Sequence, residues 1–413
     1  MKFIRSLGLL ALSLCSLQVA KGATKGQEEC NEQEASDHPV LCSMLDRLRT
    51  DPHVIAEEMY QWALVHNQIV NLNVLKSESS SSSSLRQRMR TDDNEAAEEE
   101  KSSSLPVVFG HGMGDACENE GMQNIGKHTS QLLGGAYVTC IASADNRRDD
   151  TTNGYFLDMN SHVDIFAQKV QSDPKLAKGF HGIGFSQGNN IIRGYIAKYN
   201  DPPVHTFISI NGVNAGEGAV PYCKPSTTKT NQENDASAAV SFGSMCDLLM
   251  EQASRRAYTE FAQKHSFQAN YWRDPRPVEK EAYQEFSQLA QWNNEGKVFN
   301  QTLVDNWSHT SKFVWVLAEQ DGMVWPKEGE QWGAPDPSNP FEHILPMNQT
   351  EWYIKDLFGL RTAQEAGKNY FESFDGDHLQ FSIEDFDGWV STYLLGREDV
   401  DGHQSSEIRT SVA

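Results

Sequence analysis

The chain has 413 residues, which is enough for one large α/β domain with insertions or for two ordinary domains. Its formal net charge of −22 argues against a protein that holds nucleic acid or anionic membrane by electrostatic attraction. Hydrophobic residues make up 38 % of the chain, so a sizeable core is available between polar linkers.

The first 22 residues have the pattern of a secretory signal peptide. Lys2 and Arg5 precede an apolar run that ends near Ala20, and Ala20 and Gly22 are small residues suited to cleavage. The run is too short and too rich in serine for a stable membrane span; the alternative is a buried N-terminal helix. We therefore expect the mature chain in the secretory pathway, either in the lysosome or vacuole or outside the cell.

Two segments separate this signal from the first strand. Residues 23–76 carry apolar residues at helical spacing and predict a helical N-terminal arm. Residues 77–104 are rich in serine and acidic residues and predict a disordered linker, because they have almost nothing to bury. The arm is compatible with a propeptide, a packing arm or a partner-binding element.

From Leu105 onward, short apolar runs alternate with helical stretches, which is typical of βαβ units and a parallel sheet. The predicted strands lie at 105–110, 135–143, 181–185, 204–212, 312–322 and 369–382. Helices are predicted at 162–173 and 189–199, and within 244–265 and 280–292. Residues 217–312 interrupt the alternation and predict a helical cap inserted into a domain that spans 105–396, followed by a polar tail at 397–413.

Cys15 lies in the signal, so six of the seven cysteines remain in the mature chain. An even number in an oxidising compartment predicts up to three disulfides, with about fifteen possible pairings. The simplest pairings join sequence neighbours: Cys30 with Cys42, Cys117 with Cys140, and Cys223 with Cys246. No C-x-x-C or H-E-x-x-H spacing is present, so we expect no metal site.

The pentapeptide GFSQG places Ser186 where an apolar strand gives way to a helical stretch. A serine on such a sharp turn is exposed above the sheet at a helix N-terminus, and the glycines on either side let strand and helix approach closely. This pattern predicts a nucleophile. The alternative is a tight turn in which Ser186 only caps the helix.

A serine hydroxyl needs a general base, and in this kind of fold the acid and the base follow the serine on loops after later strands. Asp321 lies just past the apolar part of the run at 312–322, and His378 lies in the turn-rich stretch after the apolar part of the last run. Ser186, Asp321 and His378 therefore form the predicted catalytic triad.

Other histidines and carboxylates fit these roles less well. His181 and His205 lie in strands, and the sequence reveals no sheet element directly after His343. Asp375 and Asp377 compete for the role of the acid, but they are too close to His378 in sequence to reach its far nitrogen in the usual geometry.

An oxyanion hole requires two backbone N–H donors. One is the amide after the nucleophile, here Gln187, and the second usually follows an early strand. The glycine-rich loop FGHGMGDAC follows the first strand and makes the amide of Met113 the best candidate. The absence of a following G-K-[ST] argues against a phosphate-binding loop.

Three N-x-[ST] sequons predict surface glycosylation in a secreted chain; they begin at Asn300, Asn306 and Asn348.

Five motifs occur in an order that resembles the palmitoyl-protein thioesterases: VVFGHGMGD, GIGFSQGNNIIRGYI, ISINGVNAG, YWRDP and GDHLQ. These are lysosomal or secreted α/β-hydrolases that remove long acyl chains from cysteines of lipid-modified proteins. The resemblance runs from about residue 105 to 395. It implies the same triad, the same oxyanion donors and a helical insertion that holds the acyl chain.

The resemblance further implies S-palmitoylated proteins or peptides and other long-chain acyl thioesters as substrates, no cofactor, and a Cys223–Cys246 pair at the start of the insertion. Three features depart from the family: the arm and linker at 23–104, a longer and more polar segment between these cysteines, and Val213 with Asn214 where glutamine and histidine are more usual. Two other functions remain open: a lipase or phospholipase that acts on oxygen esters, and a secreted binding protein that has lost activity.

Overall fold

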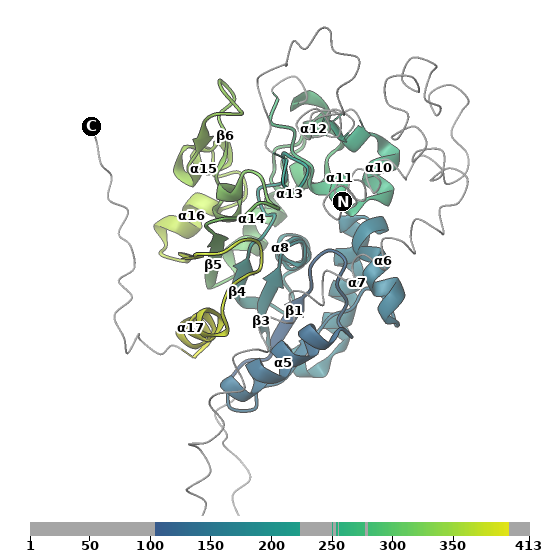
Figure 1. The fold of residues 1–413 in the computed structure, drawn as a ribbon, viewed down its shortest axis with the longest axis vertical. Coiled ribbons are helices and arrows are strands. Elements are labelled where there is room, and N and C mark those ends of the chain that lie inside the picture. Colours follow the sequence, from purple (N-terminus) through teal and green to yellow (C-terminus); the bar gives the residue numbers. More distant parts are fainter. Residues whose placement is uncertain (1–103, 224–249, 251–252, 255, 277–279, 396–413) are drawn as a thin grey trace, which may run out of the picture.

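The computed structural model describes residues 104–223, 250, 253–254, 256–276 and 280–395 (Figure 1). The predicted signal peptide, N-terminal arm, linker up to residue 103 and C-terminal tail lie outside the described residues, and so do Cys30, Cys42 and Cys246.

The centre of the fold is a sheet of parallel strands in the order β2-β1-β3-β4-β5-β8. The strands are β1 (Val107–Gly110), β2 (Val138–Cys140), β3 (Phe180–Phe185), β4 (Val204–Ile210), β5 (Lys312–Ala318) and β8 (Asn369–Phe374). Each lies within or overlaps a predicted strand, although the run predicted to 382 ends as a strand at Phe374. Because all six strands run the same way, the loops after their carboxyl ends meet at one edge of the sheet.

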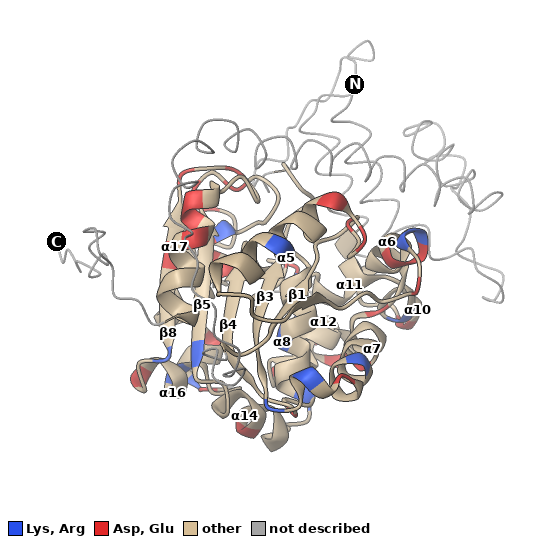
Figure 2. Ribbon diagram, turned by 90° about the horizontal axis from the view of Figure 1, so that it is seen from below, with Lys and Arg blue, Asp and Glu red and all other residues tan. Residues whose placement is uncertain are grey.

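Helices cover both faces of this sheet (Figure 1, Figure 2). One face carries α5 (Glu120–Leu132) and α17 (Ile383–Leu394). The other carries α7 (Met159–Ser172), α8 (Gly188–Lys198) and α14 (Gln301–Ser308). This arrangement confirms the predicted α/β class with a parallel sheet flanked by helices.

The strands are apolar on both sides because each face is covered. In β5, Phe313 and Trp315 belong to the core cluster shared with α7 and α8, whereas Val314 and Val316 belong to the cluster shared with α5 and α17. Successive side chains of a strand point to opposite faces, so one strand contributes to both cores. This explains why the sequence shows continuous apolar runs rather than alternation.

Several short elements connect these layers. They are α6 (Arg147–Phe156), η3 (Pro174–Leu176), η5 (Lys327–Gln331), η6 (Met347–Gln349), α15 (Glu351–Ile354) and α16 (Leu360–Glu365). A separate antiparallel pair joins β6 (Ala334–Pro335) to β7 (Ile344–Leu345). The expectation of no sheet element after His343 is therefore wrong, since β7 begins at the next residue; a two-residue strand is too short to leave a sequence pattern.

The described part of the predicted insertion is helical. It contains α10 (Glu260–His265), α11 (Phe267–Tyr271), α12 (Lys280–Phe286) and α13 (Gln288–Trp292). The serines that precede α11 and α13 accept hydrogen bonds from backbone N–H groups of the next turn, so these residues restart the chain as a new helix.

The last helix within the predicted range 217–312 does not belong to a cap. Helix α14 packs beside α8 on the sheet: Asn306 Nδ2 donates to the carbonyl of Ala197, and Asn200 Nδ2 donates to the carbonyl of Asn306. The predicted insertion therefore extends too far toward the C-terminus, because α14 is the helix that covers the sheet before β5.

Covalent features follow the sequence prediction in part. Cys117 and Cys140 form a disulfide, and Cys223 is also disulfide-bonded.

Asn300 and Asn348 are exposed, but Asn306 is half-buried against α8. All three asparagines are thus at least partly exposed. Within the described ranges, every helix is too short or too polar to cross a bilayer.

Two glycines allow β1 and α8 to approach each other closely. A Cβ on Gly188 would lie 2.2 Å from the carbonyl oxygen of Gly110, and a Cβ on Gly110 would lie 2.7 Å from that of Gly188. Real side chains do not tolerate such distances. Only glycine at both positions lets the loop after β1 lie against the first turn of α8.

Replacing Gly188 by alanine should destabilise the fold by at least about 1–3 kcal/mol, because backbone must move to admit the methyl group. Urea unfolding measures this change. Gly388→Ala in α17 is the matched control: a Cβ there meets nothing within 4 Å, and the change should be neutral or stabilising by up to ~1 kcal/mol. Equal stability of Gly188→Ala and the wild type would contradict the packing argument.

Candidate active site

Ser186 occupies the turn between β3 and α8 in a left-handed backbone conformation, with φ of 51°. Its N–H donates to the carbonyl of Ile210, and Asn189 Nδ2 donates to the carbonyls of both Ser186 and Ile210. Non-glycine residues adopt this conformation at a cost, and such strain concentrates at functional sites. The surrounding hydrogen bonds hold the turn in place.

The side chains of Ser186, His378 and Asp321 meet at the carboxyl edge of the sheet. Ser186 Oγ lies 2.8 Å from His378 Nε2, and His378 Nδ1 lies 2.6 Å from Asp321 Oδ2. Both distances are hydrogen-bonding distances, so the hydroxyl, the imidazole and the carboxylate form one chain. The structure therefore brings together the three predicted residues, and Ser186 does not act as a side-chain cap of α8.

Asp321 is held as an ionised acceptor. Its side chain is fully buried, and Oδ1 accepts hydrogen bonds from the N–H groups of Met323 and Val324 at 2.7 and 2.8 Å. Burial opposes the charge, but the charge and hydrogen bond of His378, together with the other donors, outweigh it and lower the pKa of Asp321 to about 2. Asp321 can therefore orient His378 and balance an imidazolium charge.

The competing residues take other roles. Asp377 Oδ1 accepts from the backbone N–H groups of Gly322 and His378, each at 2.8 Å, and so ties the loop after β5 to the loop after β8. Asp375 accepts from Gln320. His181 is buried in β3, where burial lowers its pKa to about 4, and His343 is exposed.

The two predicted oxyanion donors lie beside the nucleophile. A Cβ on Gly112 would lie 3.4 Å from Ser186 Cβ, so the loop that carries Met113 passes next to the serine. In the described part of the chain, the backbone N–H groups of Met113 and Gln187 donate to no other protein group. Both are thus available to a developing oxyanion.

The side chain of Gln187 is anchored by residues that the sequence analysis missed. Gln187 Nε2 donates to the carbonyl of Gly154 at 2.7 Å, and Gln187 Oε1 accepts from Gln268 Nε2 at 2.8 Å. Gly154 lies in α6 and Gln268 in α11, so the insertion contacts the oxyanion region directly. No sequence motif marks Gly154 or Gln268, because only the folded chain brings them to Gln187.

A buried ion pair lies beneath the loop of Met113. His111 Nε2 is 3.2 Å from Asp150 Oδ2, and His111 Nδ1 donates to the carbonyl of Gly112 at 3.0 Å. Asp150 also accepts from the backbone N–H groups of Ser143 and Cys117. Burial lowers the pKa of His111, but the hydrogen bond and charge of Asp150 outweigh this effect and raise the pKa to about 9. His111 is therefore a buried imidazolium at neutral pH.

Two groups of side chains in the described residues place metal-ligating atoms close together. The first is His111, Cys117 and Asp150, but the sulfur of Cys117 is in a disulfide and offers no thiolate. The second consists of Asp321, His378 and the buried Glu330. In this second group, His378 and Asp321 are hydrogen-bonded to each other, and His378 is also hydrogen-bonded to Ser186.

Val213 and Asn214, two of the departures noted in the sequence, support the chain after β4. The carbonyl of Val213 accepts from Asn190 Nδ2, and Asn214 Nδ2 donates to Ser209 Oγ. Both residues are buried. The loop is therefore tied to α8 through the carbonyl of Val213 and to β4 through the side chain of Asn214.

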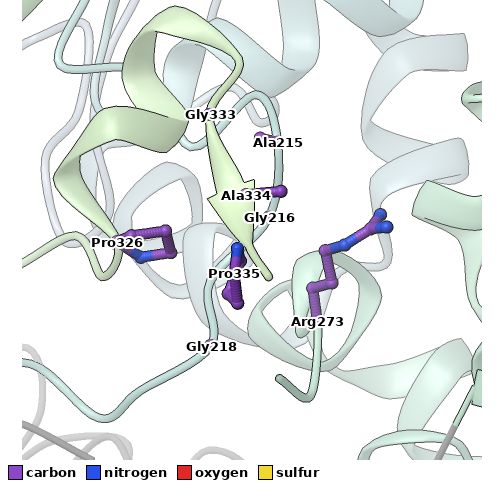
Figure 3. Close-up of a pocket in the computed structure, with 8 residues that line it drawn as sticks. All are labelled: Ala215, Gly216, Gly218, Arg273, Pro326, Gly333, Ala334 and Pro335. Atoms are coloured by element: carbon purple, nitrogen blue, oxygen red, sulfur yellow. The ribbon is translucent and has the colours of Figure 1, made fainter. Parts of the chain in front are cut away.

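A small hollow lies between the chain after β4 and β6 (Figure 3). It is lined by Ala215, Gly216, Gly218, Arg273, Pro326, Gly333, Ala334 and Pro335. The guanidinium of Arg273 points away from it, and Glu295 pairs with that group. The volume of the hollow, about 10 Å³, is far below the roughly 300–1,000 Å³ of typical ligand sites, and we assign no acyl-binding role to it.

Removing His111 should change how stability depends on pH. The raised pKa of His111 means that the stabilisation by the ion pair is fully present below about pH 6.5 and is lost as the pH rises through about 9. The difference in unfolding free energy between the wild type and His111→Gln should therefore shrink by up to about 3 kcal/mol between pH 6.5 and pH 9. Urea unfolding at each pH measures it, and a pH-independent difference would refute the imidazolium assignment.

Comparison with known proteins gives a consistent set of relatives. A family model for palmitoyl protein thioesterase matches residues 106–378. Palmitoyl-protein thioesterase 1 of Caenorhabditis elegans is 32 % identical over 277 residues, covering 67 % of this chain and 87 % of the relative. Palmitoyl-protein thioesterase 3 of Dictyostelium discoideum is 31 % identical, covering 68 % and 87 %. Lysosomal thioesterase PPT2 of Homo sapiens is 25 % identical, covering 63 % and 78 %.

Solved structures with a similar arrangement are more distant. A serine hydrolase from the bacterium Cycloclasticus zankles is 13 % identical, covers 72 % of this chain and 91 % of its own, and has a TM-score of 0.35. Carboxylesterase CesB from Bacillus subtilis is 11 % identical, covers 72 % and 86 %, and also has a TM-score of 0.35.

Proposed function

The chain belongs to the palmitoyl protein thioesterase family, and from this premise we propose that it removes long-chain fatty acyl groups from S-acylated cysteines of proteins through Ser186, His378 and Asp321. The observation that carries the proposal is the continuous hydrogen-bonded chain from Ser186 Oγ through His378 to Asp321. The family supplies the class of reaction, and this geometry supplies the residues.

In the first half of the reaction, His378 Nε2 accepts the proton of Ser186 Oγ while that oxygen attacks the thioester carbonyl. The backbone N–H groups of Met113 and Gln187 stabilise the oxyanion, and the charge of Asp321 stabilises the imidazolium. The carbon–sulfur bond then breaks. A cysteine thiolate leaves readily because its pKa is about 8.5, and His378 returns the proton to it.

In the second half, His378 accepts a proton from water as that water attacks the acyl-Ser186 ester. The second oxyanion is held by the same two amides, and the bond to Ser186 Oγ breaks as His378 protonates the oxygen. The products are a free fatty acid and the unmodified enzyme. The protein groups named here supply every proton transfer in this sequence.

We also propose that the protein works in the lysosome or vacuole or outside the cell. The relatives named as lysosomal thioesterases, the predicted signal peptide and the disulfide between Cys117 and Cys140 support an oxidising compartment on the secretory route. The exposed sequons at Asn300 and Asn348 support the same route.

Substrate choice tests the proposed activity. With palmitoyl thioester and the matching oxygen ester at equal concentration, the wild type should hydrolyse the thioester with the higher kcat/KM. Ser186→Ala should abolish hydrolysis and labelling by a serine-directed phosphonate, because no nucleophile remains. Retained labelling would refute the assignment of Ser186, and a preference for the oxygen ester would indicate a lipase-type carboxylesterase instead.

Asp321→Asn should lower kcat by about 10⁴-fold, because an amide N–H directed at Nδ1 forces His378 into the tautomer that cannot accept the serine proton. Steady-state hydrolysis of the palmitoyl thioester measures the loss. Asp375→Asn is the control; Asp375 is an exposed carboxylate on the loop after β8 and accepts a hydrogen bond from Gln320. Comparable losses in both variants would contradict the role of Asp321.

A further inference from the structure

Glu330 is a buried carboxylic acid that the mechanism above does not use. It lies in η5, and its exposed fraction is 0 %. Oε2 accepts hydrogen bonds from Asn211 Nδ2 at 2.9 Å and from the N–H of Ala318 at 3.0 Å. Oε1 is equally buried, and no donor among the described residues reaches it.

The carboxyl group of Glu330 lies against that of Asp321. Candidate ligand atoms of Glu330, Asp321 and His378 all lie within 4.8 Å of one another. Two carboxylates this close in a buried site cannot both carry a charge at low cost, so their pKa values must separate. The geometry indicates that Asp321 is the charged one. Asp321 accepts hydrogen bonds from three N–H groups, whereas Glu330 accepts two, both on the same oxygen.

We propose that Glu330 is a protonated carboxylic acid whose hydroxyl, on Oε1, donates a hydrogen bond to the carboxylate of Asp321. Glu330 is then a positioning residue, since it touches neither substrate nor Ser186. It fixes the carboxylate of Asp321, which in turn orients His378. The proposal rests on the catalytic triad inferred above. The proton accounts for Oε1, which otherwise would be a buried oxygen without a partner.

Electrostatics favours the same assignment. Burial and the charge of Asp321 raise the pKa of Glu330 well above its usual value. The hydrogen bond from Glu330 is one of the contacts that lower the pKa of Asp321. The proton is thus located on Glu330, and the charge on Asp321.

Glu330 is also connected to the loop that carries His378. Asn211 donates to Glu330 with Nδ2, and its Oδ1 accepts the backbone N–H of Leu379, the residue after His378, at 2.9 Å. The backbone N–H of Asn211 donates to the carbonyl of Val316 in β5. Glu330 therefore supports both Asp321 and, through Asn211, the turn that presents His378.

Two substitutions of Glu330 test whether it acts as a neutral hydrogen-bond donor to Asp321. In Glu330→Gln the amide NH₂ replaces the hydroxyl as donor, and the amide oxygen still accepts from Asn211 and Ala318. This variant should keep kcat within about threefold of the wild type. Glu330→Met has a similar shape but offers no hydrogen bonds, and it should lower kcat on palmitoyl thioester about 10–100-fold while KM changes less than about threefold.

Glu328→Met is the matched control, because Glu328 lies in the same short helix, is only half-buried and has no role in the site. It should behave as the wild type. Wild-type kcat in Glu330→Met would overturn the proposal. A loss in Glu330→Gln as large as that in Glu330→Met would also overturn it, because a neutral donor would then be insufficient.

If Glu330→Met does not fold, Glu330→Gln decides the question through the ¹H NMR resonance of the His378 Nδ1 proton. A downfield resonance at the wild-type position supports a neutral donor beside Asp321, and a displaced or lost resonance overturns it. Failure of the proposed function is distinguishable: if the wild type does not cleave thioesters, the rate of Ser186 labelling by the phosphonate replaces kcat in the same comparison.

Discussion

The site depends on one strained turn, in which Ser186 is held in a left-handed conformation between a central strand and the helix that follows it. Helix α8 could not lie against the end of β1 if Gly110 and Gly188 carried side chains. The turn therefore fixes three things together: the direction of Oγ, the availability of the Gln187 amide, and the path of the loop with Met113. Packing of backbone on backbone is what keeps this geometry rigid.

Around this turn, each buried carboxylate that carries a charge has hydrogen-bond donors or a cation beside it. Asp321 accepts hydrogen bonds from His378 and from two backbone N–H groups, and Asp150 pairs with His111. An isolated buried charge would cost several kcal/mol, whereas a paired and hydrogen-bonded one is tolerated. The same rule leads to a neutral Glu330, because a second negative charge next to Asp321 would have no cation to balance it.

The insertion does more than cover the sheet. Gln268 of α11 donates both to the side chain of Gln187 and to the carbonyl of Gly154, and so links the insertion to the residue after the nucleophile. A shift of α11 would therefore move Gln187, whose backbone N–H is one of the two predicted oxyanion donors.

The sequence by itself determined the parallel strands, the turn at Ser186 and the order of the triad, because apolar runs and glycine spacing express local rules of folding. It did not reveal that α14 belongs to the sheet layer, since an amphipathic helix looks the same wherever it packs. Only the tertiary structure decided the roles of Glu330, Gln268 and the pair of His111 with Asp150. Their partners are distant in sequence, and a buried polar residue acquires its charge state and its function from neighbours that folding alone supplies.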